Sequence, residues 1–371
     1  MDIGIYCETL DAKTLAAPDV LSLLGSRAAT LGHALRFDER FDPDALAPHL
    51  ELGEWLRSAG GRYALWPLVP KSLGYWVHEG NLDAVDRMAD ALLAGCARFG
   101  ARPDLWVIDV EMSWRQMEAL VFPGPPPWRR ALSAVRLAFH NRDPRRFARS
   151  AARLAKIVAR LREGGTPVAA TVFPFLIADL AAGGHALQDY LEMPVFPVPF
   201  DAWNAMFYNS YIPHAAPFLV PPAAAPRALF EYMGVLAARA GAGAWVTLGS
   251  TWEGVLPGNE GKTYTTPAQI APDVAAARAA GIETVWLYCL EGVLYADQKL
   301  TRRRPIAESE AFLDVLRTTP AREPPPDPKW TRGRRILERL VRDRRKGAYG
   351  WEETGALTPR PPLRLRGEGE A

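Results

Sequence analysis

The chain has few cysteines and few histidines. Its 371 residues hold three cysteines, and no two of them stand in the C-x-x-C spacing of a zinc site. Three scattered cysteines are too few for a disulfide framework, which favours a reducing compartment. None of the six histidines stands at an expected strand end beside a second ligand. The sequence therefore predicts neither a bound metal nor a cofactor.

The chain also lacks long apolar runs and the pattern of an export signal. No apolar run approaches 18 residues, and the start, MDIGIYCE, has no basic n-region and no apolar h-region. These absences predict a soluble, cytoplasmic protein that does not bind membranes. No G-x-G-x-x-G follows the first expected strand and no G-x-S-x-G occurs, which disfavours a dinucleotide-binding sheet and a serine hydrolase.

Neither sign of charge is in excess over the whole chain. The 44 basic and 42 acidic residues give a net charge of +2, and the hydrophobic content of 49% is typical of a folded soluble protein. Residues 321–371 carry a net charge of +5, which leaves −3 for residues 1–320. Binding of nucleic acid requires clustered Lys and Arg, so we expect no nucleic-acid partner. The one residue in clear excess is tryptophan, with 12 copies.

Eight short β-rich runs alternate with stretches of helical periodicity, which is the pattern of a parallel sheet wrapped by helices. The expected strands are residues 3–8, 34–38, 63–69, 105–111, 168–173, 202–209, 245–250 and 284–290. Eight such units predict an α/β fold, a (β/α)8 TIM barrel over residues 1–318, with an open doubly wound sheet as the alternative. Residues 319–371 are expected to form a basic, partly disordered tail rich in Pro and Arg, with a short amphipathic helix at 334–346.

The strongest catalytic candidates end the fourth expected strand, because reactive groups of a barrel lie at the carboxyl ends of its strands. Side chains alternate along a strand, so Asp109 and Glu111 share one face while Ile108 and Val110 point at the helices. Two acids at this spacing have Cα atoms roughly 6.5 to 7 Å apart. At a desolvated barrel mouth one of them should keep its proton near neutral pH. Glycoside cleavage needs such a proton donor at the leaving oxygen.

Other acidic and aromatic residues are expected around this pair. Glu8 and Glu291 follow the first and eighth strands, which are neighbours in a closed barrel. Aromatic residues cluster just after strand ends, where flat apolar faces stack on sugar rings. We expect a carbohydrate partner that contacts the two glutamates and this aromatic group, which comprises Trp66, Tyr75, Trp76, Trp114, Trp252 and Tyr295.

The fourth-strand segment resembles a known motif. The run Asp104-Leu-Trp-Val-Ile-Asp109-Val-Glu111 is similar to the D-x-x-D-x-D-x-E of chitinase-like barrels, glycoside hydrolases that act on N-acetylglucosamine polymers. Val107 stands in place of the middle Asp. The family's third-strand S-x-G-G is absent, and residues 66–70 read Trp-Pro-Leu-Val-Pro instead.

Two further segments resemble the same family. Met206-Phe-Tyr208-Asn209 is similar to its M-x-Y-D on the sixth strand, with Asn209 in place of the Asp. Trp286 stands where the family keeps an eighth-strand tryptophan beneath the sugar. Lysozyme-like muramidase barrels also carry a D-x-E on a strand and are alternative relatives.

The resemblance implies roles for the matching residues. Glu111 would be the general acid and then the base, and Asp109 would steady it and the substrate's acetamido group. Tyr208 would hydrogen-bond the acetamido oxygen, which in that family is the nucleophile. Glu8 or Glu291 could act as an enzymic nucleophile instead.

Two other functions are open at this point. The missing acid at position 107, the missing third-strand motif and the missing export signal favour a catalytically silent barrel that binds a glycan. The third hypothesis is a metal-dependent barrel isomerase or aldolase, with an all-oxygen Mg²⁺ or Ca²⁺ site built from Glu8, Asp109 and Glu111. The sequence does not indicate the oligomeric state, the sugar or the linkage.

Overall fold

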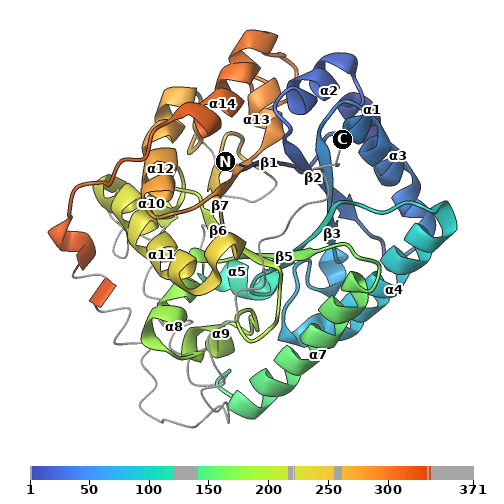
Figure 1. The fold of residues 1–371 in the computed structure, drawn as a ribbon. Helices are drawn as coiled ribbons and strands as arrows, with labels where there is room; N and C mark the ends of the chain where they lie inside the picture. Colours follow the sequence, from blue (N-terminus) through green and yellow to red (C-terminus); the bar gives the residue numbers. More distant parts are fainter. Residues whose placement is uncertain are drawn as a thin grey trace, which may run out of the picture.

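The computed structural model describes residues 2–120, 141–215, 220, 222–254, 261–331 and 334–335. Eight parallel strands close into a barrel in chain order, so the predicted fold is confirmed (Figure 1). The strands are β1 (Asp2–Cys7), β2 (Thr30–Arg36), β3 (Arg62–Leu68), β4 (Leu105–Val110), β5 (Val168–Val172), β6 (Ala202–Phe207), β7 (Ala244–Gly249) and β8 (Thr284–Tyr288). β8 closes the ring by pairing with β1 from Thr284↔Asp2 to Tyr288↔Tyr6.

β2 differs most from its predicted bounds, because it begins at Thr30 rather than at position 34. Its first half contains Gly32, which has low strand propensity. Pairing with both neighbours overrides that preference, since Gly32 lies opposite Tyr6 of β1 and Ala64 of β3. The strand ends at Arg36 rather than at position 38, and Arg36 shares the inward face of the strand with Gly32.

Helices wrap the barrel on its outside (Figure 1). They are α1 (Ala12–Leu15), α2 (Pro18–Gly25), α3 (Ala47–Ser58), α4 (Leu82–Phe99), α5 (Trp114–Leu120), α7 (Pro144–Arg162), α8 (Ile177–Ala182), α9 (Ala186–Tyr190), α10 (Ile212–Ala215), α11 (Ala225–Ala240), α12 (Pro267–Ala279), α13 (Leu290–Leu294) and α14 (Ile306–Thr318). Local signals set several starts: Asp143 caps α7, and Thr266 forms a capping box with Gln269 ahead of α12. None of the described helices combines the length and apolar character that a membrane span requires.

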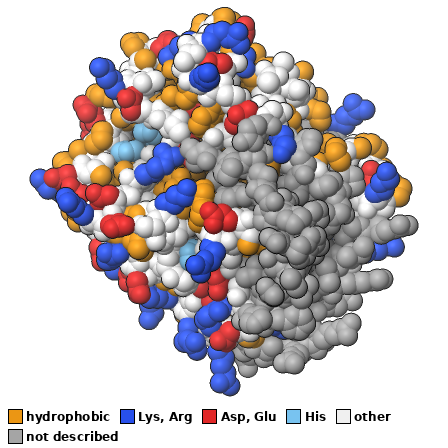
Figure 2. Space-filling view, turned by 180° about the vertical axis from the view of Figure 1, so that it is seen from behind, with side chains coloured by type: hydrophobic (Ala, Val, Ile, Leu, Met, Phe, Trp, Pro, Cys, Tyr) orange, Lys and Arg blue, Asp and Glu red, His pale blue; other side chains and the backbone are white. Residues whose placement is uncertain are grey.

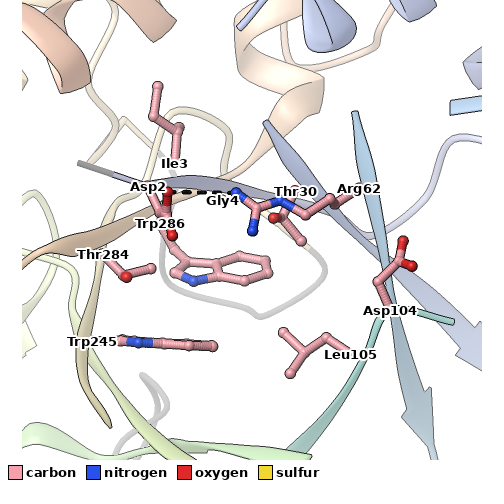
Figure 3. A pocket seen from close by; sticks show the side chains of 10 residues that line it. All are labelled: Asp2, Ile3, Gly4, Thr30, Arg62, Asp104, Leu105, Trp245, Thr284 and Trp286. Carbon is pink, nitrogen blue, oxygen red and sulfur yellow. Dashed lines mark hydrogen bonds and ion pairs between the residues drawn. The ribbon is translucent and has the colours of Figure 1, made fainter. Parts of the chain in front are cut away.

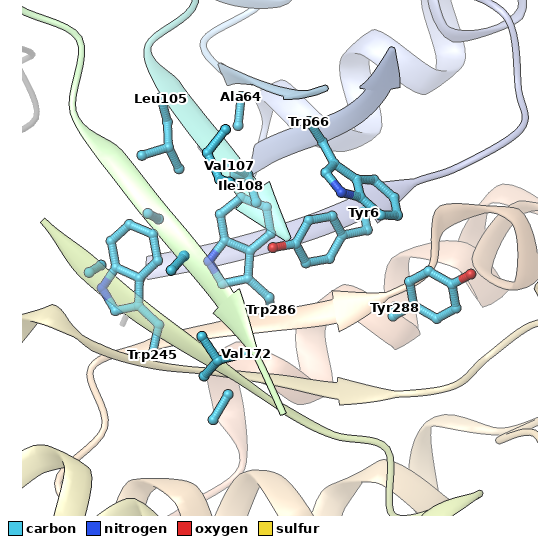
Figure 4. Packing of buried hydrophobic residues seen from close by; sticks show 14 of the residues in the cluster. Tyr6, Ala64, Trp66, Leu105, Val107, Ile108, Val172, Trp245, Trp286 and Tyr288 are labelled. Carbon is cyan, nitrogen blue, oxygen red and sulfur yellow. The ribbon is translucent and has the colours of Figure 1, made fainter. Parts of the chain in front are cut away.

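A row of aromatic rings fills the barrel interior (Figure 4). The ring centroids of Trp245 and Trp286 are 6.1 Å apart, those of Trp286 and Tyr6 are 4.7 Å apart, and Trp66 meets Tyr6 edge-on at 5.1 Å. Gly4 leaves the space that this row needs, because a Cβ there would lie 2.1 Å from Cδ2 of Trp286. The row starts near the amino end of the barrel and ends at Trp66, near the carboxyl end.

A small pocket lies at the amino end of the barrel, next to this row, and Trp245 and Trp286 are among the residues that line it (Figure 3). Asp2 forms an ion pair with Arg62 at 3.4 Å across its mouth. Asp104, the first acid of the motif run, also lies at this end and accepts a hydrogen bond of 2.8 Å from the Tyr63 backbone N–H. Asp104 therefore fastens the start of β3 and lies far along the strand from Glu111.

The chain beyond α14 returns to the barrel. The Arg322 backbone N–H donates to the Ala275 carbonyl of α12 at 3.1 Å. Trp330 is buried edge-on against Tyr232 of α11 at 5.3 Å, and its indole N–H donates to Glu231 at 2.8 Å. The first part of the expected tail thus packs on the barrel, and most of the expected helix at 334–346 lies outside the described residues. Acidic and basic side chains are interspersed on the described part of the face in Figure 2.

Candidate active site

Three carboxyl groups gather at the carboxyl end of the barrel. Glu8 directly follows β1, Asp109 lies in β4 and Glu111 directly follows β4. All three are buried, with no more than 5% of any residue exposed. Burial first, and then the charges of Asp109 and Glu8, raise the pKa of Glu111 well above its usual range. The three groups are therefore close enough for their charges to interact.

A backbone bridge positions Glu111. The Val77 N–H donates to the Asp109 carbonyl at 2.9 Å, and the Glu111 N–H donates to the Val77 carbonyl at 3.1 Å. The segment after β3 thereby extends the sheet alongside the end of β4. Within the described parts of the chain, no donor is hydrogen-bonded to the Glu111 carboxyl group. A buried acid without donors favours its protonated form, as a general acid must.

The Asp109 side chain is hydrogen-bonded to a tryptophan of the barrel interior. The Trp66 indole N–H donates to Oδ2 of Asp109 at 2.7 Å, whereas Oδ1 is buried with no partner among the described residues. Burial raises the pKa of Asp109 to about 7, against hydrogen bonds from Trp66 and Thr171 and with a smaller contribution from the charge of Glu8. Asp109 therefore titrates close to neutral pH.

A chain of hydrogen bonds across the interior lies beneath Asp109. Oγ1 of Thr247 donates to Asn204 at 2.8 Å, the Asn204 amide donates to the Tyr6 hydroxyl at 2.9 Å, and that hydroxyl lies 3.0 Å from Oγ1 of Thr171. Sequence reasoning missed these residues. Side-chain alternation along β5, β6 and β7 would have placed them inside the barrel.

Glu8 has the donors that Glu111 lacks. Its Oε1 accepts from Nη2 of Arg36 at 3.0 Å and from the Tyr75 hydroxyl at 3.4 Å, and its Oε2 accepts from the Tyr288 hydroxyl. Burial raises the pKa of Glu8, while the Tyr288 hydrogen bond and the Arg36 charge oppose that rise. Arg36 and Tyr288 were not predicted as site residues, although Tyr288 shares the inward face of its strand with Trp286.

Tyr208 lies beside the same acids. It is half-buried at the end of β6, and its ring stacks on Tyr288 with centroids 5.2 Å apart. Burial, and then the charges of Asp109 and Glu111, raise the pKa of the Tyr208 hydroxyl well above its usual range. The hydroxyl therefore stays protonated and can donate a hydrogen bond to a ligand.

Glu291 secures the turn after β1. Its Oε1 accepts from the backbone N–H groups of Glu8 and Thr9 at 2.7 and 2.6 Å, and from the Thr9 hydroxyl at 3.1 Å. The Cys7 thiol lies 3.6 Å from the same oxygen. The structure thus gives Glu291 a position from which it orients Glu8, and its expected contact with a sugar stays a prediction.

Asn209 and Trp286 lie away from the three acids. Alternation that turns Tyr208 inward turns Asn209 toward the helices, where its amide donates to Asp273 of α12 at 2.7 Å. Trp286 is 1% exposed and is covered by Tyr6 on the side of the acids. Both side chains are thus engaged in contacts of the barrel itself, and their expected contact with a substrate stays a prediction.

The predicted aromatic group divides into packed and accessible members. Trp66, Trp76 and Trp252 are buried, and the Trp252 indole N–H donates to the Gln298 carbonyl at 3.0 Å. Trp114 is half-buried and stacks on Trp76 with centroids 5.6 Å apart. The Lys71 ammonium lies 3.6 Å from the centroid of the Trp114 ring. Of these four tryptophans, Trp114 is therefore the one that is partly exposed.

Tyr75 joins the aromatic pair to the acids. Its ring meets Trp76 and Trp114 edge-on at 5.0 and 5.9 Å, and its hydroxyl reaches Glu8.

In the part of the chain that the structure describes, no three His, Cys, Asp or Glu side chains are grouped so that they could hold a metal ion. The arrangement supports acid and base chemistry beside an aromatic surface.

No family model and no curated protein matches this chain. Among solved structures, the catalytic domain of β-amylase from Paenibacillus polymyxa is similar, with a TM-score of 0.52 and 7% identity over 86% of this chain and 98% of that domain. A GH5 xyloglucanase from Bacteroides ovatus has a TM-score of 0.49 and 12% identity over 85% of this chain and 75% of its own. A D-psicose 3-epimerase from Clostridium cellulolyticum H10 has a TM-score of 0.43 and 13% identity over 87% of this chain and 100% of its own. The likeness to glycoside hydrolase barrels is therefore one of fold.

Proposed function

We propose that this protein is a glycosidase of the barrel type that cleaves a glycan by carboxylic acid/base catalysis, with Glu111 as the general acid and then the base. The observation that supports the proposal is the environment of Glu111: a carboxyl group at the carboxyl end of the barrel, 5% exposed, beside two other acids and without a hydrogen-bond donor among the described residues. Such a group retains its proton at neutral pH, and the departing oxygen of a glycosidic bond needs that proton.

The neighbouring side chains support the same chemistry. Glu111 gives its proton to the leaving oxygen and later takes one from the attacking water. Asp109, held by Trp66, lies close enough for its charge to raise the basicity of Glu111. The Tyr208 hydroxyl, which stays protonated beside the acids, offers a donor to the substrate.

The finer proposal is that the glycan contains N-acetylhexosamine. It rests on the resemblance of the Asp109-Val-Glu111 and Met206-Phe-Tyr208 segments to chitinase-like barrels. In this version Tyr208 donates its hydroxyl proton in a hydrogen bond to the acetamido oxygen.

The test is the Glu111→Gln variant, assayed beside the wild type on aryl glycosides, including β-N-acetylglucosaminides, and on soluble glycan fragments. We expect kcat/KM to fall by at least about a hundredfold, because the amide cannot supply the proton. Glu54→Gln, at an exposed position of α3, is the matched control and should keep wild-type activity. A wild type that cleaves nothing in the panel, or a Glu111→Gln variant with full activity, contradicts the proposal.

A second candidate is a barrel that binds a glycan without cleaving it. It is favoured by Val107, which stands where the resembling family has an acid, and by the lack of a partner for Oδ1 of Asp109 among the described residues. Isothermal calorimetry on the same glycan panel separates the two candidates, because binding without turnover supports the second and contradicts the first.

A further inference from the structure

The two glutamates of the site have opposite hydrogen-bonding environments. Glu8 receives three donors, from Arg36, Tyr75 and Tyr288. Nη1 of Arg36 also donates to the Glu8 carbonyl at 2.6 Å, so the guanidinium group is fixed at two points on the same residue. Hydrogen bonds from a cation and from hydroxyl groups stabilise an ionised carboxylate.

Glu111 has none of these donors among the described residues. The surroundings of Glu111 therefore favour the protonated carboxyl group, and those of Glu8 favour the ionised carboxylate. When two neighbouring carboxyl groups have environments that favour different protonation states, the protonated one serves as the acid and the ionised one as the base or nucleophile. On this criterion Glu111 is the acid and Glu8 is the ionised partner.

The two groups belong to strands that are not neighbours in the barrel. β1 and β4 are separated by two strands in one direction round the ring and by four in the other. One short segment nevertheless contacts both residues, because the Tyr75 hydroxyl reaches Oε1 of Glu8 while the Val77 carbonyl accepts from the Glu111 N–H. The bond to be cleaved would lie between the acid and the ionised carboxylate.

Glu291 is the other glutamate near β1, and its position rather than its number of donors argues against this role. Its Oε1 accepts from the backbone N–H groups of Glu8 and Thr9, and the residue is 0% exposed, whereas Glu8 is 4% exposed. It holds the backbone of Glu8 in place.

We propose that Glu8 is the enzymic nucleophile and that the enzyme retains the anomeric configuration of its substrate; this inference rests on the proposed glycosidase function. A lone pair of a Glu8 oxygen forms a bond to the anomeric carbon, while the electrons of the scissile bond pass to the leaving oxygen, which takes the Glu111 proton. Water then bonds to the anomeric carbon, gives a proton to Glu111, and the ester electrons return to Glu8.

The first experiment labels the wild-type protein with 2-deoxy-2-fluoroglycosyl fluorides of the gluco, galacto, manno and xylo series. These probes contain no acetamido group, so only an enzymic nucleophile can form a stable adduct with them. We expect intact-mass spectrometry to show the addition of one glycosyl unit, and peptide mapping to place it on Glu8. Because the wild type is used, the result does not depend on the folding of a variant.

The second experiment follows the anomeric configuration of the first-formed product by NMR, with the substrate that the wild type cleaves best. Retention is expected. The Glu8→Ala variant with added azide should form a glycosyl azide of inverted configuration, whereas Glu111→Ala with azide should form one of retained configuration. Glu8→Gln, which is nearly isosteric, should lose at least about a thousandfold in kcat/KM with an unchanged far-UV spectrum.

The outcomes distinguish this inference from the proposed function. An inverted product, an adduct on another residue, or full activity of Glu8→Gln overturns the role of Glu8 and leaves glycosidase activity standing. Retention with cleavage of N-acetylhexosaminides alone and no labelling assigns the nucleophile to the substrate's acetamido group, which also overturns it. If the wild type cleaves no glycan and is not labelled, the proposed function fails and the inference fails with it.

Discussion

The two ends of the barrel hold their acidic side chains in opposite ways. At the amino end, the side chains of Asp2 and Asp104 are 56% and 30% exposed, and each faces an arginine, Arg62 at 3.4 Å and Arg57 at 3.3 Å. Exposed ion pairs of this kind cost little and contribute little to stability.

At the carboxyl end, the three buried acids Glu8, Asp109 and Glu111 have one arginine partner among the described residues, Arg36, and it contacts Glu8. Burying carboxyl groups without donors costs free energy of folding. The comparison indicates that the acids at the amino end cost the fold little, whereas the carboxyl end retains an arrangement that stability alone would not favour. Such a cost is typical of a functional site.

The largest expected effect on stability is at the amino end. Trp286→Ala should lower the free energy of unfolding by about 3 to 5 kcal/mol, because it empties the middle of the aromatic row. Urea unfolding measures this loss. Trp55→Ala is the matched control, since Trp55 is 39% exposed on α3, and it should change the value by no more than about 0.5 kcal/mol. Equal losses in the two variants would mean that the row does not support the barrel.

The next largest effect is the pH dependence of the unfolding free energy that Asp109 causes at the carboxyl end. The pKa of Asp109 is raised to about 7 in the folded protein, against about 3.9 in an unfolded chain. A raised pKa favours folding at low pH, and the contribution is lost as the pH rises from about 4 to about 7. Asn does not titrate, so the stability of the wild type relative to Asp109→Asn should fall across this window, by at most about 1.4 kcal/mol per pH unit.

Urea unfolding of both proteins at several pH values measures this difference. A difference that does not change between pH 4 and pH 7 would show that Asp109 titrates normally, and the contrast between the two ends would be lost. Comparing the two proteins at each pH removes the contribution of His33 and His49. Burial lowers their pKa values to about 4 and about 3, so they destabilise wild type and variant alike as the pH falls below about 6.5.

The smallest effect is expected for the ion pair at the amino end. Asp2→Asn removes the partner of Arg62 and should lower the free energy of unfolding by less than about 1 kcal/mol, because the Asp2 side chain is 56% exposed. Activity should not change. A loss comparable to that of Trp286→Ala would mean that ion pairing, rather than ring packing, stabilises this end.

The fold was predictable from the sequence to a large extent, because each strand is a short apolar run and helix signals such as Thr266 with Pro267 separate the runs. The bounds of β2 were not, since Gly32 becomes strand only through pairing on both sides. The difference at the end of the strand explains why Arg36 was missed as a site residue: a strand assigned to residues 34–38 placed Asp38, not Arg36, at its end.

The site was predictable where alternation along one strand is sufficient. Asp109 and Glu111 share a face for that reason, and Tyr208 lies beside them. Contacts between distant segments were not predictable. The hydrogen bonds of Glu8, the attachment of Glu291 to residues 7 to 9, and the burial of Trp286 beneath Tyr6 depend on which side chains meet inside the closed ring.

The aromatic row limits the routes by which a ligand can reach the buried acids. Rings from Trp245 to Trp66 occupy the axis of the barrel, with neighbouring centroids 4.7 to 6.1 Å apart. The stacked rings block the axis of the barrel between its two ends. If the protein acts on a glycan as proposed, the glycan binds across the rim at the carboxyl end, and both products leave through that same end.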